Sequence, residues 1–221
     1  MKLLLKGLIK FAVGFLLIGV LLFLPAGGFH YANGWLFLGL LFVPMLILGI
    51  ILFFKAPELL EKRLNSKEKE DTQKGVLALS ALIFPIGFLL SAFDFRFSLS
   101  SVPDWCMAAA SILFLIGYAM YAEVMRENAY LSRTVEVQEN QKVIDTGLYG
   151  IVRHPMYLAT FLMFLPLPLI LGSFWGLIPF ALYPFVIVIR ILNEEKVLAN
   201  DLSGYTEYMK KVKYRLIPLI W

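Results

Sequence analysis

The chain has very few of the residues that build disulfide frameworks, metal centres or soluble nucleotide-binding domains. Of its 221 residues, one is cysteine (Cys106) and two are histidine. A single cysteine excludes an internal disulfide and any multi-cysteine metal site, so we expect no metal centre. The sequence also contains no Gly-x-Gly-x-x-Gly run. This excludes the glycine-rich phosphate turn of a soluble Rossmann domain.

Charge is scarce over long stretches of the chain. Hydrophobic residues make up 60% of the sequence, whereas soluble domains average roughly 45–50%. Six largely uncharged runs approach the ~20 residues that span a bilayer. They are expected at about 8–24, 35–54, 76–92, 105–123, 155–171 and 174–192. We therefore predict an all-α, polytopic helical membrane protein with about six transmembrane helices, the last two forming a C-terminal helical hairpin.

The basic residues are distributed unevenly among the connections between these runs. The formal net charge is +4, but 19 of the 20 Lys and Arg residues fall on one side of the six-helix scheme, with Arg96 as the exception. Basic residues that flank apolar runs indicate the positive-inside effect rather than a nucleic-acid partner. We expect both termini on the cytoplasmic side of the membrane.

The polar segments suggest a division of the chain near residue 74. Residues 1–74 would hold two transmembrane helices and a cytoplasmic loop, with a short helix beginning at Pro57. Residues 75–221 would hold four transmembrane helices, the polar connection before the fifth of the six runs, and the C-terminal tail. Alternation between Val135 and Ile144 hints at a short hairpin or extended flap. In the tail, Tyr205, Tyr208, Met209 and Val212 share a helical face, which is typical of a helix on a membrane surface.

A polar cluster lies directly before the fifth apolar run, where Tyr149, Arg153 and His154 precede Pro155. Pro155 is suited to begin a helix, because the N–H group that it lacks has no helical partner at that position. His154 would then lie at a helix mouth, where free backbone N–H groups and a partial positive charge favour anions. The sequence therefore predicts an anion-binding site here.

The hairpin should bring a second polar cluster beside the first. Its tip is near Ser173, with His154 19 residues before it and Glu194 21 residues after it. At ~1.5 Å rise per residue, both ends return to the same depth. We expect His154 and Tyr157 to face Arg190 and Glu194. The plainer interpretation is that the basic residues only set topology and that Arg190 and Glu194 form a surface ion pair worth ~0–1 kcal/mol.

Several motifs together resemble the isoprenylcysteine carboxyl methyltransferase family, whose members are integral membrane enzymes that use S-adenosylmethionine. The resemblance rests on the run Gly147 to Tyr157, which reads Gly-Leu-Tyr-Gly-Ile-Val-Arg-His-Pro-Met-Tyr, on Glu194-Glu195, on Tyr205 with Tyr208, and on the tail Tyr214 to Pro218. A weaker similarity covers Pro57 to Leu64. The chain departs from the family pattern at Leu148, Gly150 and Ala159, which affects pocket shape and acceptor choice more than cofactor use.

The resemblance implies a cytoplasmic S-adenosylmethionine pocket and a neighbouring acceptor site. The cofactor-binding positions correspond here to Gln138, Gln141, Lys142, Val143, Ile144, Tyr149, His154, Pro155, Met156, Tyr157 and Glu194. Glu194 would accept ribose hydroxyls or balance the sulfonium charge, and His154 would hold the cofactor carboxylate. Tyr149 and Tyr157 would pack on the adenine or near the sulfonium. Arg190 would orient the acceptor bidentately, so Arg190 and Glu194 are the catalytic pair we expect.

The expected reaction is methyl transfer to an amphiphilic acceptor. A carboxylate such as that of isoprenylcysteine is favoured, because it is ionised at neutral pH and needs no general base. A phospholipid or other lipid amine is an alternative that would first have to lose a proton. A membrane sterol reductase, a transporter and a non-catalytic membrane subunit are further alternatives, although transporters place ionisable groups at mid-membrane. The expected partners are the lipid bilayer and an amphiphilic or prenylated small molecule or protein, with no nucleic acid.

Overall fold

The computed structural model describes residues 2–64, 71–132 and 137–221, and within them every regular element is a helix. In chain order these are α1 (Lys2–Ala26), α2 (Ala32–Lys55), α3 (Pro57–Leu64), α4 (Asp71–Phe97), α5 (Asp104–Glu127), the 3-10 helix η1 (Gly147–Gly150), α6 (Pro155–Phe164), α7 (Leu167–Ile170), α8 (Leu177–Phe180), α9 (Tyr183–Asp201) and α10 (Tyr205–Lys211).

Five segments of the described chain are long and apolar enough to cross a membrane. They are Lys2–Ala26, Ala32–Lys55, Ala78–Phe97, Asp104–Glu127 and Leu177–Asp201, and a shorter apolar segment spans Pro155–Ile170. Large apolar side chains on α1 and α2, such as Leu16, Leu24 and Phe54, are exposed as lipid contact requires. The predicted all-helical, polytopic membrane fold is confirmed.

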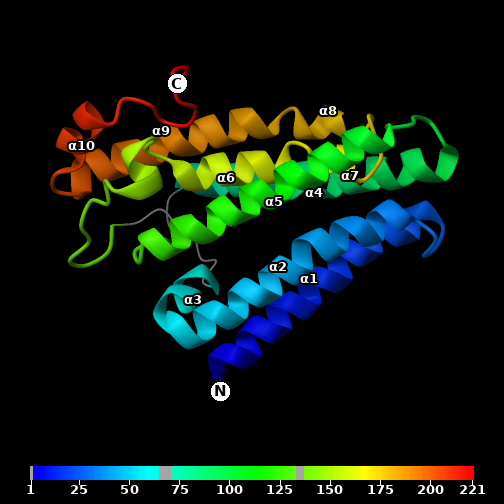
Figure 1. Ribbon diagram of the computed structural model, residues 1–221, viewed down its shortest axis with the longest axis horizontal. Helices are drawn as coiled ribbons and strands as arrows, with labels where there is room; N and C mark the ends of the chain where they lie inside the picture. Colours follow the sequence, from blue (N-terminus) through cyan, green and yellow to red (C-terminus); the bar gives the residue numbers. More distant parts are fainter. Residues whose placement is uncertain (1, 65–70, 133–136) are drawn as a thin grey trace.

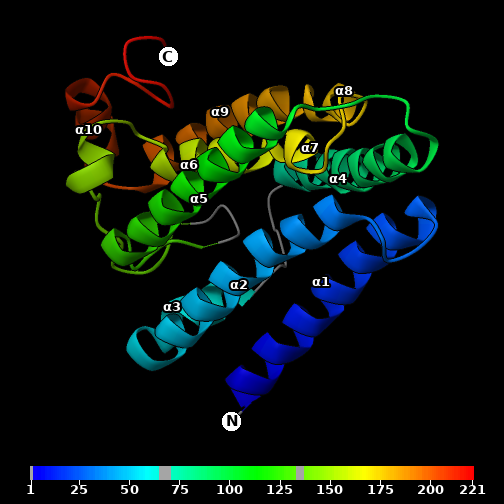
Figure 2. The ribbon, with the colours of Figure 1, turned by 45° about the vertical axis from the view of Figure 1, so that its right-hand side comes forward.

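The long helices run alongside one another, as Figures 1 and 2 show from two directions. α1 packs against α2 and α4, and α5 packs against α6. The turns between α1 and α2 and between α4 and α5 lie at one end of the bundle, on the right of Figure 1. α3, η1, α10 and both chain termini lie toward the opposite end. This opposite end is called the polar end below.

Proline divides both arms of the C-terminal hairpin into separate helices. α6 ends at Phe164, and Pro166 precedes α7. In the second arm, α8 contains Pro179, and Pro184 lies in the first turn of α9. Proline lacks a backbone N–H and clashes with the preceding turn. Proline therefore interrupts the helix in each arm, and Pro155 begins α6 as expected.

A buried carboxylate fixes the hairpin tip at the end away from the polar end. Asp94, at the end of α4, has no exposed surface. It accepts hydrogen bonds from the Ser100 backbone N–H at 2.6 Å and from the Ser173 hydroxyl at 2.5 Å. These contacts join α4, the connection to α5 and the hairpin tip. They set how deep the hairpin sits, and therefore where its other end emerges.

Two expectations about the polar segments need correction. No strand forms in the described residues 137–146, where Gln141 N–H instead donates to the Gln138 carbonyl in a turn. The predicted hairpin is wrong for this part, and Val135 lies outside the described residues. The apolar face of α10 packs on the protein itself, since Tyr205 and Tyr208 are buried against a cluster that includes Leu202. Burial by the protein, rather than by lipid, accounts for that face.

Candidate functional site

A cavity of about 330 Å³ lies at the polar end of the bundle. α3, α4, α6, α9 and α10, η1 and the connections between them all contribute to its wall. Eleven of the twelve residues expected from the sequence line it: Gln141, Lys142, Val143, Ile144, Tyr149, His154, Pro155, Met156, Tyr157, Arg190 and Glu194. The hairpin therefore brings the two polar clusters together in one cavity.

Gln138 is the expected residue that is not part of this wall in the described structure. Its side-chain amide donates to the Tyr130 carbonyl at 2.5 Å. Its backbone N–H donates to the Gln141 side-chain oxygen at 2.9 Å. Tyr130 and Gln141 both line the cavity, so Gln138 supports the wall from behind.

Glu195 is the centre of a buried ion cluster behind the cavity. Its carboxylate accepts Arg153 Nε at 2.6 Å and Arg215 Nε at 2.7 Å, and lies 3.3 Å from His154 Nε2. The exposed fractions of Arg153, His154 and Glu195 are 7%, 4% and 5%. A buried carboxylate is stabilised only when its oxygens are paired in this way. The cluster joins α9, the start of α6 and the C-terminal tail.

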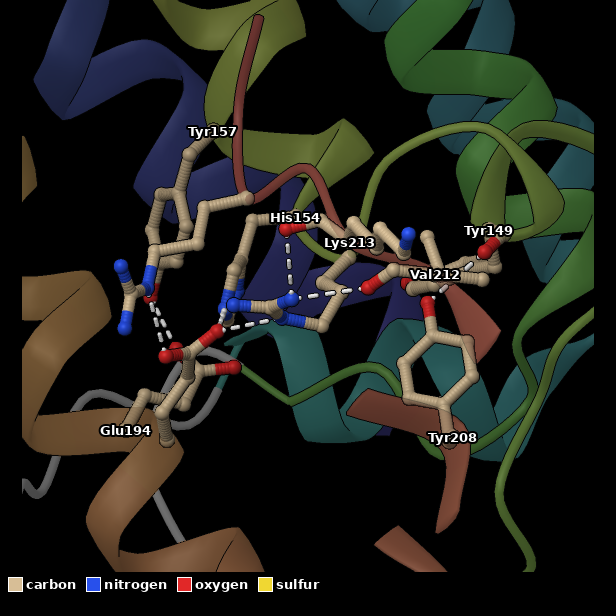
Figure 3. A network of polar contacts seen from close by, with 10 residues as sticks. Tyr149, His154, Tyr157, Glu194, Tyr208, Val212 and Lys213 are labelled. Atoms are coloured by element: carbon tan, nitrogen blue, oxygen red, sulfur yellow. Dashed lines mark hydrogen bonds and ion pairs between the residues drawn. The ribbon is translucent and has the colours of Figure 1, made fainter. Parts of the chain in front are cut away.

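The tail also pairs with the entrance to α6 through the backbone. Arg153 N–H donates to the Tyr214 carbonyl and His154 N–H to the Arg215 carbonyl, both at 2.9 Å. Arg153 Nη1 further donates to the carbonyls of Val212 and Lys213, at 2.7 and 3.0 Å. Figure 3 shows these two tail residues beside His154. His154 lines the cavity, where it is expected to hold an anion, and its Nε2 lies against Glu195.

Tyr157 joins the two residues of the expected catalytic pair. Its hydroxyl donates to Glu194 Oε2 and accepts Arg190 Nε at 2.8 Å. The Arg190 guanidinium also lies 5.8 Å from the centre of the Tyr157 ring. Tyr157 and Glu194 face each other on the opposite side of His154 from Tyr149 (Figure 3). Tyr157 of α6 therefore links Arg190 and Glu194, which lie four residues apart on α9.

Tyr149 is held in the cavity wall by η1 and its neighbours. Gly147 begins η1 with φ +51°, and a side chain there would collide with the Glu127 carboxylate, which accepts the Leu148 N–H at 3.1 Å. The Tyr149 hydroxyl accepts Asn128 Nδ2 at 2.9 Å, and its carbonyl accepts the Tyr208 hydroxyl at 2.8 Å. Burial raises the pKa of Tyr149 well above its ordinary value, so its hydroxyl stays protonated at neutral pH.

Two cavity residues of functional interest were not assigned from the sequence. Arg63, on α3, donates to the Ser132 carbonyl at 2.9 Å and to the Tyr121 hydroxyl at 2.5 Å. Its only sequence signal was the weaker similarity of Pro57 to Leu64. Tyr205 was part of the resemblance but received no role. Its hydroxyl is buried, with no hydrogen-bond partner in the described structure.

Besides the polar side chains described above, which form its polar part, the cavity has an apolar wall. This wall is formed by Phe84 of α4, Phe164 of α6, and Tyr183, Val186 and Ile187 of α9. Arg190 lies one turn after Val186 and Ile187 on α9. The Arg190–Tyr157–Glu194 chain therefore lies where the polar and apolar parts meet.

One protein-family model matches the part of the chain that holds most of these residues. Residues 105–203, somewhat under half of the chain, match the phospholipid methyltransferase family. The matched segment contains Tyr149, His154, Arg190 and Glu194, whereas α1, α2 and α3 lie outside it. No curated protein matches the chain. Residues 105–203 are therefore similar to the integral membrane methyltransferases, a group that includes both the phospholipid and the isoprenylcysteine carboxyl methyltransferases.

Proposed function

We propose that this protein transfers a methyl group from S-adenosylmethionine to an amphiphilic acceptor inside the described cavity. The observation that carries the proposal is the chain Arg190–Tyr157–Glu194 at the junction of its polar and apolar parts. A carboxylate on one side and a guanidinium on the other can hold two different ligands next to each other.

The residues of the polar part fit S-adenosylmethionine. The cavity volume of about 330 Å³ lies within the roughly 300–1,000 Å³ of small-molecule sites. Glu194 can accept hydrogen bonds from ribose hydroxyls, and the rings of Tyr149 and Tyr157 offer faces to an adenine or a sulfonium. Arg63 and Lys142 add positive charge to the wall. These residues therefore offer partners for the ribose, for the adenine or sulfonium, and for the negatively charged carboxylate of the cofactor.

The apolar wall supports a lipid-like acceptor. Its side chains come from α4 and α9, which lie in candidate membrane spans, and from α6, which lies in the shorter apolar segment Pro155–Ile170. An acceptor with a hydrocarbon chain would gain about 0.8 kcal/mol for each methylene that it buries there. Its polar head would then lie beside Arg190, whose planar guanidinium is suited to bind a carboxylate or phosphate in a bidentate way.

The chemistry requires positioning more than proton transfer. When bound, S-adenosylmethionine supplies an activated methyl group on a sulfonium. Glu194 binds and orients the cofactor, Arg190 orients the acceptor, and the Tyr157 hydroxyl fixes both side chains. Holding two reactants in an aligned geometry is worth about 7–11 kcal/mol of a bimolecular barrier. The apolar wall excludes water, which would otherwise compete for the methyl group.

The acceptor that this site fits best is a carboxylate. Glu194 already accepts the Tyr157 hydroxyl, and Glu195 and His154 are joined in the buried cluster. A carboxylate needs none of them as a base, because it is ionised at neutral pH. The second candidate is the amine of a phospholipid, which the family match of residues 105–203 favours.

Calorimetry with S-adenosylmethionine tests the proposal whatever the acceptor is. Glu194→Gln should bind the cofactor about ten-fold or more weakly, because one charge-assisted hydrogen bond contributes about 1.5–3 kcal/mol. Arg190→Lys should bind it nearly as wild type does but turn over more slowly, since lysine lacks the planar fork. Wild-type protein that does not bind S-adenosylmethionine would refute the proposal. Equal loss in both variants would instead indicate a structural Arg190–Glu194 unit.

The chemical stability of the product separates the two acceptor classes. Membranes that contain the protein would be incubated with cofactor carrying a radiolabelled methyl group, and the lipid extract would then be treated with base. A carboxyl methyl ester releases its label as methanol, whereas a methylated amine retains it. Label released as volatile methanol supports the carboxylate acceptor, and label that remains non-volatile on the headgroup supports the phospholipid amine.

The orientation of the site is also proposed. The polar end holds α3, η1, α10 and both termini (Figure 1), and 19 of the 20 basic residues fall on this side of the six-helix scheme. By the positive-inside rule this side is cytoplasmic. The cavity would then open where a soluble cofactor is supplied.

A further inference from the structure

We propose that Arg63 of α3 binds the carboxylate of the cofactor's methionine part, from a helix outside the matched family segment. The inference rests on the proposed function, because it assigns a ligand group of S-adenosylmethionine to a residue of the same cavity. It makes the N-terminal part of the chain a component of the cofactor site.

The carboxylate of a bound amino-acid ligand needs a cationic partner in the cavity wall, and two of the basic residues there already pair with a carboxylate. Of the residues that the structure describes, the basic ones that line the cavity are Arg63, Lys142, Arg153, His154 and Arg190. Arg153 and His154 both contact Glu195, and Arg153 also donates to two tail carbonyls. Both are almost fully buried. These two residues stabilise the tail and the start of α6, and Glu195 already balances their positive charge.

Arg190 belongs to the acceptor side of the cavity. It lies on α9 one turn after Val186 and Ile187, which are part of the apolar wall. Its Nε donates to the Tyr157 hydroxyl. An acceptor whose hydrocarbon chain lies along this wall brings its head to Arg190. The cofactor carboxylate is then left with Arg63 and Lys142.

Arg63 is the better prepared of the two remaining cations. Its side chain is partly buried and fixed by the Ser132 carbonyl at 2.9 Å and the Tyr121 hydroxyl at 2.5 Å. Its guanidinium also lies 5.5 Å from the Tyr121 ring centre. These two bonds use two of the five N–H groups of a guanidinium, which leaves donors for an anion. A fixed planar fork loses little side-chain entropy when it binds a carboxylate.

Lys142 is exposed to solvent and has a long flexible side chain. Solvent and salt screen such a charge strongly, so its attraction for a carboxylate is weaker. The positive charge of Arg63, by contrast, affects the pKa of a residue in the cavity wall. Burial raises the pKa of Tyr149, and the positive charge of Arg63 works against that rise. Arg63 and Tyr149 also line the same cavity.

The experiment compares two ligands that differ only in the carboxylate. S-adenosylmethionine and decarboxylated S-adenosylmethionine would be titrated into purified full-length wild type, Arg63→Gln, Arg63→Lys and Lys142→Gln. Wild type should prefer S-adenosylmethionine about ten-fold or more, as one charge-assisted contact provides. Arg63→Gln should lose this preference while its affinity for the decarboxylated ligand stays the same. Arg63→Lys should retain part of it, and Lys142→Gln should retain most of it.

The ratio of the two affinities distinguishes ligand binding from a structural role. If Arg63 only braced Ser132 and Tyr121, its loss would weaken both ligands equally and leave the ratio unchanged. That result, a wild-type ratio near one, or collapse of the ratio in Lys142→Gln would overturn the inference. Failure of wild type to bind either ligand would instead remove the proposed function. If Arg63→Gln does not fold, Arg63→Lys gives the same comparison, because its ratio must fall.

Discussion

Glu194 and Glu195 are adjacent in sequence, but replacing each of them with glutamine should affect a different property of the protein. Glu195→Gln removes the charge at the centre of the buried cluster and leaves Arg153, His154 and Arg215 around a neutral amide. One face of that amide is an NH₂ group, which would point at a cationic donor. We predict that this variant is strongly destabilised, whereas Glu194→Gln mainly loses cofactor affinity.

The structure allows an estimate of the size of this effect. Removing one partner of a buried ion pair costs about 3–5 kcal/mol, because the remaining charge is left uncompensated. The Arg153 and Glu195 side chains are only 5% and 6% exposed, so this range applies. For a chain of this length, about 1 kcal/mol shifts the unfolding midpoint by roughly 2–4 °C. The expected decrease is therefore roughly 6–20 °C.

Thermal unfolding in detergent, followed by tryptophan fluorescence, measures this decrease. The matched control is Glu123→Gln, which breaks the Glu123–Arg126 pair on α5. Those side chains are 41% and 72% exposed, and an exposed pair contributes about 0–1 kcal/mol. The control should unfold within a few degrees of wild type. A Glu195→Gln midpoint as high as that of the control would refute the view that this cluster stabilises the cavity.

Two further predictions concern the tail and the topology. Tyr205→Phe removes a buried hydroxyl that has no partner in the described structure, so the free energy of unfolding should stay the same or rise. Its neighbour Tyr208→Phe should lower that free energy by about 1–3 kcal/mol, because the Tyr149 carbonyl loses its donor. Chemical denaturation of both variants tests this, and equal losses would contradict it. A reporter fused after Trp221 should be active in the cytoplasm, and activity only outside would overturn the proposed orientation.

The membrane-spanning helices can be predicted from the sequence because a bilayer restricts the structures that can cross it. A spanning helix must satisfy its own backbone hydrogen bonds and present an apolar surface, so length and hydropathy identify it directly. Equal arm lengths on either side of Ser173 then fix which ends of the hairpin meet. This is why the sequence alone is enough to place His154 and Glu194 in one cavity. The spans themselves are predicted a few residues short, since helix ends such as Phe97 extend past the apolar core.

The arrangement around those residues depends on contacts that leave no local pattern. Arg63 reaches Ser132 across 69 positions and Tyr121 across 58, and Arg153 reaches Glu195 across 42. The local sequence around an arginine does not indicate which distant carboxylate it will pair with. His154 is the clearest case, because its place at the helix mouth was predicted from Pro155 while its partner, Glu195, was not.

The geometry of α9 explains how two consecutive carboxylates serve two different purposes. Successive residues on a helix point about 100° apart. With Glu195 directed into the buried cluster, Glu194 must face sideways, toward Tyr157 and the cavity. The tail fixes this rotation, because Arg215 binds Glu195 while its carbonyl accepts the His154 N–H at the start of α6. One charged cluster thus orients α6 and α9 relative to each other, which would hold the proposed cofactor site in a fixed geometry.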